Sequence, residues 1–323
     1  MRYSDIVDYS KLDPVKRQAI TQFGPLMENV AQKGVRILPE TLGEPAIAIE
    51  ISGSDFLIAF NVEGLGTKNL IAEQMATDPR GKGVQYFEDI GVDTLAMATN
   101  DLSAIGAEPI VYGDILSSGD SNYFASEEKT AALLGGFKTA AAELNMAIPC
   151  GETPTLSGVV YPHTLDMAGA AVGLIRPKSN LTVGQQLQSG DVLIGLASSG
   201  VHANGISLIR HIAEKLPKGY FTELPQSGKV LGEELLIPTR LYSNVLMDLL
   251  SACEVHYLQP ITGHGWKKIM RHKKSFSYEI DFVPPAGELF EFLQQQAGLP
   301  DSEAYYTWNM GVGYVAYIPK ESV

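Results

Sequence analysis

The apolar and polar positions first indicate a pair of strands in the early part of the chain. Residues 46–51 and 56–62 are apolar and rich in β-branched or aromatic side chains, and the turn-forming residues 52–55 separate them. Two such runs on either side of a short glycine-containing turn predict a β-hairpin. We therefore expect two adjacent strands to begin the first sheet.

Further helices and strands are predicted after this hairpin. Residues 92–105 are rich in Ala and Leu and predict a helix, whereas residues 110–115 predict an extended strand. Ser126, which two glutamates follow, is a typical helix cap, and the Ala-rich helix that it starts is expected to run to about residue 144. Residues 165–175 are apolar and rich in glycine, which is typical of a buried strand.

The second half of the chain opens with a strand, a loop and a helix. Residues 192–197 predict the strand, residues 198–200 form a Ser-Ser-Gly loop, and residues 204–213 predict the helix. Backbone amides at the start of such a helix point into the preceding loop, and the helix dipole favours an anion there. The loop is therefore a candidate anion site.

Two more elements complete the predicted second half. Residues 235–250 predict a long helix that Pro238 interrupts near its start, and residues 305–318 predict a strand around two glycines. Residues 176–180, with the sequence Arg-Pro-Lys-Ser-Asn, are the best linker candidate. Neither half alternates strands and helices around a Rossmann glycine fingerprint, so we expect both halves to be α+β.

Length and composition predict two ordinary globular domains. The chain has 323 residues, of which 45% are hydrophobic and 19% are charged. This length suits two domains of about 150 residues each, which we place at residues 1–175 and 176–323. No apolar run approaches the ~20 residues of a membrane span, and residues 1–12 lack the apolar core of a signal peptide. Because Cys150 and Cys253 lie in different halves, we expect a cytoplasmic protein with reduced thiols.

The net charge narrows the classes of partner. A formal charge of −13 would repel a nucleic-acid backbone, and no basic stripe interleaved with aromatic residues is present. One short basic cluster spans residues 267–274 and is expected to be a solvated surface turn. We therefore expect a small anionic substrate, and neither nucleic acid nor a membrane as a partner.

A glycine-containing segment at residues 63–68 is the first candidate site. Within six residues it combines a carboxylate, Glu63, two glycines, a hydroxyl and an amine, Lys68. A metal-bridged phosphate site needs these groups, with the carboxylate on Mg²⁺ and the lysine on phosphate oxygens. The alternative is a plain turn between a strand and a helix with a solvated lysine.

Two more carboxylate motifs follow. Asn100 and Asp101 lie inside an otherwise apolar helix, where they are either exposed or hold a cation, because burying them without partners is costly. Glu152 follows Gly151 after an apolar run, and a glutamate in such a loop is more often a surface residue than a ligand.

The loop after the predicted strand 192–197 carries polar side chains. Ser199, His202 and Asn204 add donors to its backbone amides. An imidazole at this position could bind phosphate or move a proton, although a lone histidine is more often structural. Residues 262–264, Thr-Gly-His, form a second glycine-containing segment just before the basic cluster.

In the order in which they occur, these motifs resemble those of the aminoimidazole ribonucleotide synthetase (phosphoribosylformylglycinamidine cyclo-ligase) family. That family carries Asp-Gly-Val-Gly-Thr-Lys, Asn-Asp-Leu with Gly-Ala-Glu-Pro, and Gly-Gly-Glu-Thr. It continues with Ser-Ser-Gly-x-His-x-Asn-Gly, Pro-Thr-Arg-x-Tyr, Thr-Gly-Gly-Gly and Asn-x-Gly-Val-Gly. The resemblance covers about four-fifths of the chain. The matching segments begin at Glu63, Asn100, Cys150, Ser198, Pro238, Thr262 and Asn309.

The chain departs from the family pattern at several positions. Glu63 stands where the family has Asp, Cys150 replaces a glycine, and His264 replaces another. The family's glycine-rich segment ahead of the first strand is reduced to residues 41–44, and the sequence ends at Val323, where the family usually continues for a final helix and strand. These departures affect the predicted carboxylate and nucleotide segments.

The resemblance implies a fold, an assembly and an activity. It implies two α+β domains of the aminoimidazole-ribonucleotide-synthetase type, in a homodimer whose first-domain sheets join in a central barrel. It also implies ATP and Mg²⁺ as cofactors. The formyl amide oxygen of formylglycinamidine ribonucleotide would be phosphorylated, and the amidine nitrogen would close the imidazole ring, with release of ADP and phosphate, in purine biosynthesis. Phosphorylation makes a poor leaving group a good one, and positioning supplies the rest of the rate.

The resemblance further implies roles for the motif residues. Glu63, Asp101 and Glu152 would hold the magnesium ion, and Lys68, Asp101 and His202 would be catalytic. The nucleotide and the substrate phosphate would contact a larger set: Gly64, Gly66, Thr67, Lys68, Asn100, Ser199, Gly200, Asn204, Thr262, Gly263 and His264.

Enzymes with other activities share these carboxylate and nucleotide-binding segments. A small-molecule kinase such as thiamin-phosphate kinase is the first alternative, and a non-catalytic nucleotide-binding relative is the second. Selenophosphate synthetase and the hydrogenase maturation dehydratase are disfavoured, because the sequence has no cysteine near either end.

Overall fold

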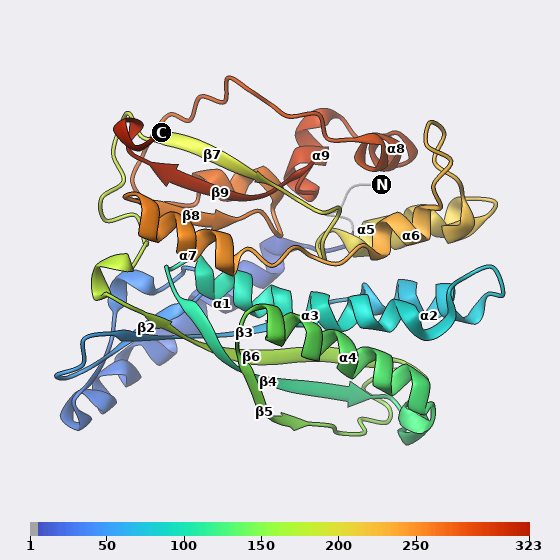
Figure 1. Ribbon diagram of the computed structural model, residues 1–323, viewed down its shortest axis with the longest axis horizontal. Coiled ribbons are helices and arrows are strands. Elements are labelled where there is room, and N and C mark those ends of the chain that lie inside the picture. Colours follow the sequence, from blue (N-terminus) through green and yellow to red (C-terminus); the bar gives the residue numbers. More distant parts are fainter. Residues whose placement is uncertain (1–5) are drawn as a thin grey trace.

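The computed structural model describes residues 6–323, which form two sheets with helices packed on them (Figure 1). The strands of the first sheet are β1 (Val35–Ile37), β2 (Ile47–Ile51), β3 (Leu57–Gly64), β4 (Glu108–Ser118), β5 (Ala147–Glu152) and β6 (Leu165–Ile175). Their order is β1-β2-β3-β6-β4-β5, and every neighbouring pair is antiparallel except β4 and β5. The predicted hairpin is confirmed as β2 and β3.

Helices α3 (Tyr86–Ser103) and α4 (Glu127–Glu143) cover one face of the first sheet. Alternate residues of β6 are buried, as expected for a strand with one covered face. Phe137 of α4 packs against Tyr112 of β4, with 6.0 Å between the ring centroids. The predicted cap of α4 is also present, because the Ser126 side chain accepts a hydrogen bond from the Lys129 amide at 3.2 Å.

The opposite face of the first sheet exposes large apolar side chains. Phe60 is 37% exposed, Val62 59% and Ile115 43%. The register places them on one face, because Val62 is paired with Ala170, which is paired with Gly113, two residues before Ile115. The sheet does not close into a barrel within the described chain.

The second sheet has three antiparallel strands in the order β7-β9-β8. These strands are β7 (Val192–Ala197), β8 (Tyr257–Pro260) and β9 (Val312–Ile318). Helix α7 (Ser243–Ala252) packs on this sheet through Leu246, which shares a cluster with Tyr314 and Ala316. The first sheet ends in sequence at Ile175 and the second begins at Val192, while the boundary predicted after residue 175 stays a prediction.

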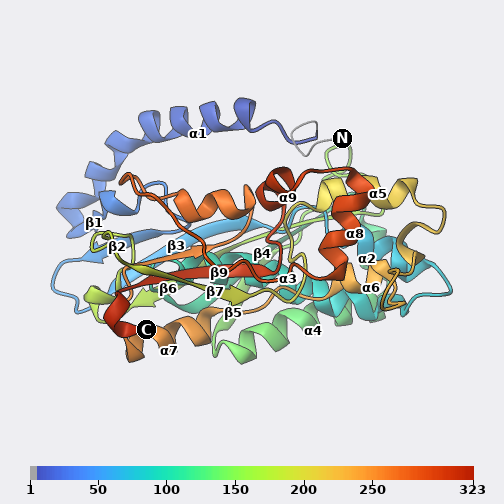
Figure 2. The ribbon, with the colours of Figure 1, turned by 90° about the horizontal axis from the view of Figure 1, so that it is seen from above.

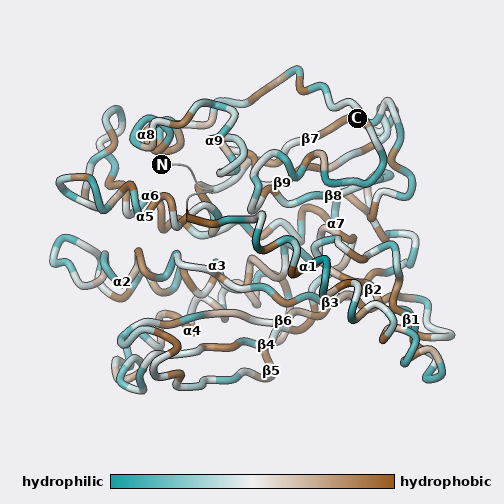
Figure 3. The backbone as a smooth tube through the Cα atoms, turned by 180° about the vertical axis from the view of Figure 1, so that it is seen from behind, coloured by the Kyte–Doolittle hydropathy of each residue, from teal (hydrophilic) through white to brown (hydrophobic). Residues whose placement is uncertain are grey.

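The remaining helices surround the two sheets. They are α1 (Tyr9–Phe23), α2 (Asn69–Thr77), α5 (Ile206–Lys215), α6 (Leu231–Leu236), α8 (Glu288–Ala297) and α9 (Asp301–Thr307). Seen from above, α1 runs along the outside of the molecule (Figure 2). Hydrophobic residues occur along β4 and α4 (Figure 3), which pack together in the core of the first half.

Two predicted elements differ from the structure. The helix predicted over residues 235–250 is divided into α6 and α7, because Pro238 disfavours helical backbone at Ile237 and has no amide to continue the ladder. The strand predicted over residues 305–318 begins only at Val312, since residues before Trp308 form helix α9. No helix among residues 6–323 has both the length and the apolarity to cross a membrane.

Candidate functional site

Polar residues of α3 hold the irregular segment 237–242 of the second half. The Asn100 side chain donates to the Arg240 carbonyl at 2.9 Å and accepts from the Tyr242 amide at 2.9 Å. The Asn100 carbonyl accepts from the Tyr314 hydroxyl at 2.9 Å. Three residues further along α3, the Ser103 hydroxyl donates to that of Ser243 at 2.7 Å. Asn100 is therefore buried with its hydrogen bonds made, and it joins the two sheets.

Lys68 and Asp93 form a second connection where the two halves of the chain meet, a contact that we call the seam. The Lys68 ammonium lies 2.7 Å from Asp93 Oδ2 and donates to the Ile237 carbonyl at 2.8 Å, and neither charged side chain is exposed. Asp93 Oδ1 accepts from the Thr239 amide at 2.8 Å. Burial raises the pKa of Asp93, while Lys68 and Thr239 act in the opposite direction. The ammonium that was predicted to meet ATP phosphates is thus enclosed by protein in this conformation.

The loop after β7 presents His202 at the same seam. Its backbone has a φ of 57°, its side chain is buried, and Nε2 accepts from the Ser199 amide at 3.2 Å. Burial, with the charges of Lys68 and Arg240, lowers the pKa of His202 to about 3. The imidazole is therefore neutral at physiological pH, and its proton lies on Nδ1 because Nε2 is an acceptor.

Gly313 makes room for this arrangement. A Cβ on Gly313 would lie 2.6 Å from Cε1 of His202 and 2.1 Å from the Tyr242 hydroxyl. Gly313 of the Asn-x-Gly-Val-Gly motif thus allows β9 to pack closely against His202 and Tyr242.

A small space is lined by residues from five of the motif segments. Its volume is about 10 Å³, which is about the room that one water molecule needs. Its lining includes Asn100 and Asp101 from α3, His202 and Asn204 from the loop after β7, and Thr262 from the loop after β8. The structure therefore brings these predicted residues together at the seam between the two sheets.

A pair of carboxyl groups lies at the edge of this space. Glu63 at the end of β3 and Asp101 on α3 are within hydrogen-bonding reach of each other. Burial raises the pKa of Glu63, and burial together with the Glu63 charge raises that of Asp101 well above its usual value. Two carboxyl groups this close need a shared proton or a cation. Hard oxygen donors suit Mg²⁺, so this pair fits that ion with further ligands from water or phosphate.

Lys268 is a site residue that the sequence did not reveal. It was expected to be a solvated member of the basic cluster, but its charge acts on both Glu63 and Asp101. Burial and the nearby Arg271 lower the pKa of Lys268 to about 8. Its position in the sequence could have indicated this role, because Lys268 lies one helical turn after Gly265 on the short helix that follows the Thr-Gly-His motif.

Glu152 does not join the carboxylate pair within one chain. The register connects Glu63 to Gly169, Asp114 and Gly151, so Glu152 points to the opposite face of the sheet. Its strand is also three positions from β3, or about 14 Å at the usual strand spacing. Among residues 6–323, no group of three or more His, Cys, Asp or Glu side chains could hold a metal ion. Within the described chain Glu152 thus lies apart from Glu63 and Asp101, and its role as a metal ligand stays a prediction.

The glycine-containing segment after β3 lies beside the pair. Gly66 has a φ of 80°, which glycine adopts without strain, and the Thr67 hydroxyl is buried without a partner in the described chain. Gly64 is exposed, at the end of β3. An orphan buried hydroxyl here fits a ligand or an ordered water.

The other predicted contacts are divided between the loops. The Ser199 hydroxyl donates to the Pro238 carbonyl at 2.6 Å, and the Gly200 carbonyl accepts from Asn309 at 2.8 Å. Gly263 and His264 lead into the helix of Lys268, and burial lowers the pKa of His264. These hydroxyl, amide and imidazole groups line the two loops that meet at the seam.

The basic cluster connects the two halves, while its residues Lys267, Lys273 and Lys274 are exposed as expected. Arg271 donates to the Gly43 carbonyl, and Lys273 donates to the Leu42 carbonyl at 3.5 Å. Glu44 in turn accepts from the Tyr257 hydroxyl at 2.9 Å. The short segment 41–44 is therefore fixed to the second half.

Comparison with known sequences decides the family. The sequence profile of the AIR synthase related protein N-terminal domain matches residues 43–175, and that of the C-terminal domain matches residues 188–322. The chain belongs to the AIR synthase related family. This confirms the resemblance seen in the motifs.

Two relatives of this AIR synthase related chain carry the same name. It is 38% identical to the phosphoribosylformylglycinamidine cyclo-ligase of Methanosarcina barkeri over 83% of this chain and 75% of the relative. It is 32% identical to the enzyme of the same name from Methanocaldococcus jannaschii, over 98% of this chain and 84% of the relative.

Solved structures share the fold at low identity. A ThiL protein complexed with AMPPCP and TMP superposes with a TM-score of 0.58 at 12% identity, covering 100% of this chain and 88% of that chain. A thiamine-monophosphate kinase from Stenotrophomonas maltophilia gives a TM-score of 0.51 at 14% identity, covering 88% of this chain and 81% of that chain. These likenesses support the two-domain α+β fold alone.

Proposed function

We propose that this chain is an ATP-dependent cyclo-ligase that converts formylglycinamidine ribonucleotide to aminoimidazole ribonucleotide in purine biosynthesis. The observation that carries the proposal is the seam where the carboxyl pair of Glu63 and Asp101 meets the loop of His202. The names of relatives that are 32% to 38% identical over most of the chain support the same reaction. The reaction phosphorylates the formyl amide oxygen, and the amidine nitrogen then displaces phosphate as the ring closes.

Glu63 and Asp101 would hold the magnesium ion, which would supply charge compensation for the phosphates of ATP. Their raised pKa values support this, because a cation is the group that would let both carboxyl groups ionise. Lys268 adds a positive charge beside them when no metal is bound. The magnesium proposal thus rests on two protein oxygen donors from one chain.

The chain's own residues would orient the substrate at the seam. A neutral, buried His202 is a poor proton acceptor at neutral pH, so we propose that it positions the Ser199 amide and the loop toward the substrate phosphate. Lys68 would act through Asp93 and the segment 237–242, and a direct contact with ATP phosphates would require it to leave Asp93. Asn204 and Thr262 would contact the substrate from the two facing loops.

We also propose a homodimer formed through the exposed face of the first sheet. Phe60, Val62 and Ile115 give that face the apolar character of an interface core. Two such sheets facing each other could close the central barrel of the family. Glu152 points to this face and would lie at the subunit boundary.

The decisive experiment is a coupled assay for ADP release. We expect ATP-dependent ADP release only when formylglycinamidine ribonucleotide is present, with aminoimidazole ribonucleotide formed in equal amount. Thiamin monophosphate is the matched alternative substrate. ADP release with thiamin monophosphate but not with the ribonucleotide would contradict the proposal, and tight ATP binding without turnover would indicate a non-catalytic relative.

A further inference from the structure

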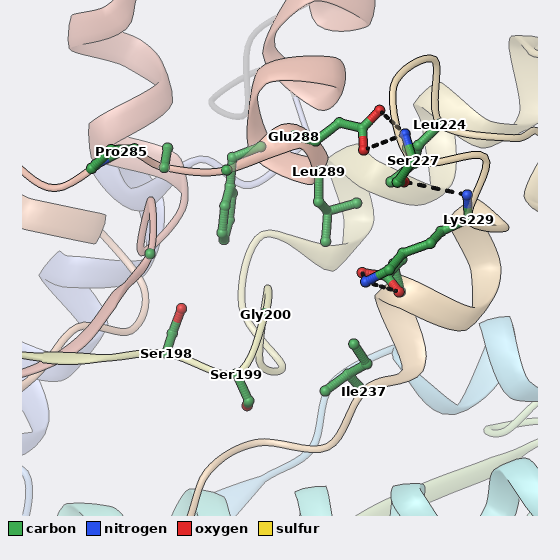
Figure 4. Close-up of a pocket in the computed structure, with 15 residues that line it drawn as sticks. Ser198, Ser199, Gly200, Leu224, Ser227, Lys229, Ile237, Pro285, Glu288 and Leu289 are labelled. Atoms are coloured by element: carbon green, nitrogen blue, oxygen red, sulfur yellow. Dashed lines mark hydrogen bonds and ion pairs between the residues drawn. The ribbon is translucent and has the colours of Figure 1, made fainter.

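A larger cavity lies within the second half of the chain, beside the loop after β7 (Figure 4). Its volume of about 350 Å³ is in the range of small-molecule pockets. Three separate segments of the chain form its walls: residues 198–200, residues 224–237, and residues 285–290 with Gly311. Neither Glu63 nor Asp101 lines it, so this cavity is a different place from the magnesium site proposed above, and it shares only the loop 198–200 with the substrate contacts proposed above.

One side of the cavity is apolar. Leu224, Ile237, Leu289 and Phe290 contribute to this side, and Phe290 is only 3% exposed. Figure 4 shows Leu289 and Ile237 coming from different segments toward the same space. An apolar wall is suited to the face of a flat ligand.

The other side offers backbone groups that have no protein partner. A Cβ on Gly311 would lie 3.5 Å from the carbonyl oxygens of both Pro285 and Ala286, so these oxygens converge on one spot. Within the described chain, neither carbonyl accepts a hydrogen bond, and the amides of Gly200 and Gly287 donate none. A ring with donors and acceptors along its edge would satisfy them.

The charged side chains on one wall of the cavity, away from the loop 198–200, disfavour a phosphate at that wall. The Lys229 ammonium is 3.1 Å from Glu234, and Glu288 accepts from the Ser227 amide at 3.1 Å, as the dashed lines of Figure 4 mark. Two carboxylates thus face one ammonium. The resulting negative wall repels an anion, whereas a neutral ligand meets no such barrier.

We propose that this cavity is a second ligand site, which binds the neutral base of a purine nucleoside. An adenine ring has an exocyclic amino donor, which suits the two carbonyl oxygens, and ring nitrogen acceptors, which suit the two amides. Its flat face would lie on the apolar wall, against Ile237 and Leu289. The sugar would extend toward the open side, away from the apolar wall.

The test is equilibrium dialysis with radiolabelled adenosine, which carries no phosphate and therefore does not depend on the carboxyl pair. We expect saturable binding at one site per chain, and competition by neither uridine nor inorganic phosphate. Ala286→Phe would fill the cavity from a position next to the free carbonyl oxygens, and we expect it to weaken adenosine binding by at least about tenfold. Ala131→Phe on the exposed surface of α4 is the matched control and should bind adenosine like the parent.

The outcomes separate this proposal from the proposed reaction. Absence of saturable adenosine binding, or equal binding by Ala286→Phe, would overturn the second site while leaving ADP release unaffected. Competition by inorganic phosphate would also overturn it, because the ligand would then be an anion. An increase in the KM for ATP that parallels the loss of adenosine binding would overturn the claim of a separate site. Circular dichroism of both variants establishes that they are folded.

Discussion

The buried ion pair of Lys68 and Asp93 gives the sharpest test of how the seam is held. Their charged atoms are 2.7 Å apart and neither side chain is exposed. At an effective dielectric constant of about 20, the Coulomb attraction at this distance is about 6 kcal/mol. Desolvation of both ions offsets much of that attraction, so the intact pair contributes little net stability. Removing one partner is different, since it strands a buried charge at a cost of about 3–5 kcal/mol.

We therefore expect Asp93→Asn to lower the free energy of unfolding by about 3–5 kcal/mol, measured by urea denaturation. Lys68→Met should cost a similar amount, because Asp93 then lacks its counter-charge and the Ile237 carbonyl its donor. The double variant should cost less than the sum of the two single variants. Asp13→Asn is the matched control, because Asp13 pairs with Lys16 at 3.6 Å on the exposed helix α1, and it should cost less than about 1 kcal/mol.

A different result would refute this reasoning. If Asp93→Asn changed the free energy of unfolding no more than the Asp13→Asn control, the pair would not hold the segment 237–242. A Lys68→Met variant with parental stability and abolished ADP release would then assign Lys68 to the phosphates of ATP. Measuring stability and turnover on the same samples distinguishes the two roles.

Three more predictions concern the carboxyl pair, the histidine and the open sheet face. Glu63→Gln and Asp101→Asn should each lower Mg²⁺-dependent ADP release by about 30- to 1,000-fold, and parental rates with unchanged Mg²⁺ dependence would move the site elsewhere. The pKa of His202 is lowered to about 3, so the unfolded state binds the extra proton below pH ~6.5. Stability should therefore decline from about pH 6.5 toward pH 3, with a shallower decline for His202→Gln in urea titrations. Phe60→Lys with Val62→Lys should shift light scattering from dimer to monomer, and a parental dimer would exclude this face.

Much of the fold could be predicted because its signals are local. The strands at residues 165–175 and 192–197 were predicted with the bounds that the structure has, since continuous apolar runs have clear ends. The helix at 92–105 was placed six residues late, because Tyr86 to Gly91 continue it with fewer alanines. Residues 235–250 were wrongly predicted as one helix, although Pro238 itself indicates a break between α6 and α7.

The site was harder to predict because it depends on which face of a strand or helix each residue occupies, and on partners far away in the sequence. Asp93, Asn100 and Ser103 are spaced by seven and three positions, so they form one polar stripe on α3, a pattern that was present in the sequence. Their partners in the second half, by contrast, are about 140 residues away. The place of Glu152 was hard to predict for a related reason, since a one-residue difference in strand register turns a side chain to the other face of the sheet.

The polar stripe of α3 also explains why the carboxyl pair depends on the rest of the seam. Asp101 directly follows Asn100, whose side chain and carbonyl are fixed by Arg240, Tyr242 and Tyr314. Any motion of the second half relative to α3 therefore acts one residue away from Asp101. The loop of His202 is attached to the same segment, because Ser199 donates to the Pro238 carbonyl. Substrate contacts and metal contacts are thus set by one short irregular segment, and a change there should disturb both together, even though none of its residues is a metal ligand.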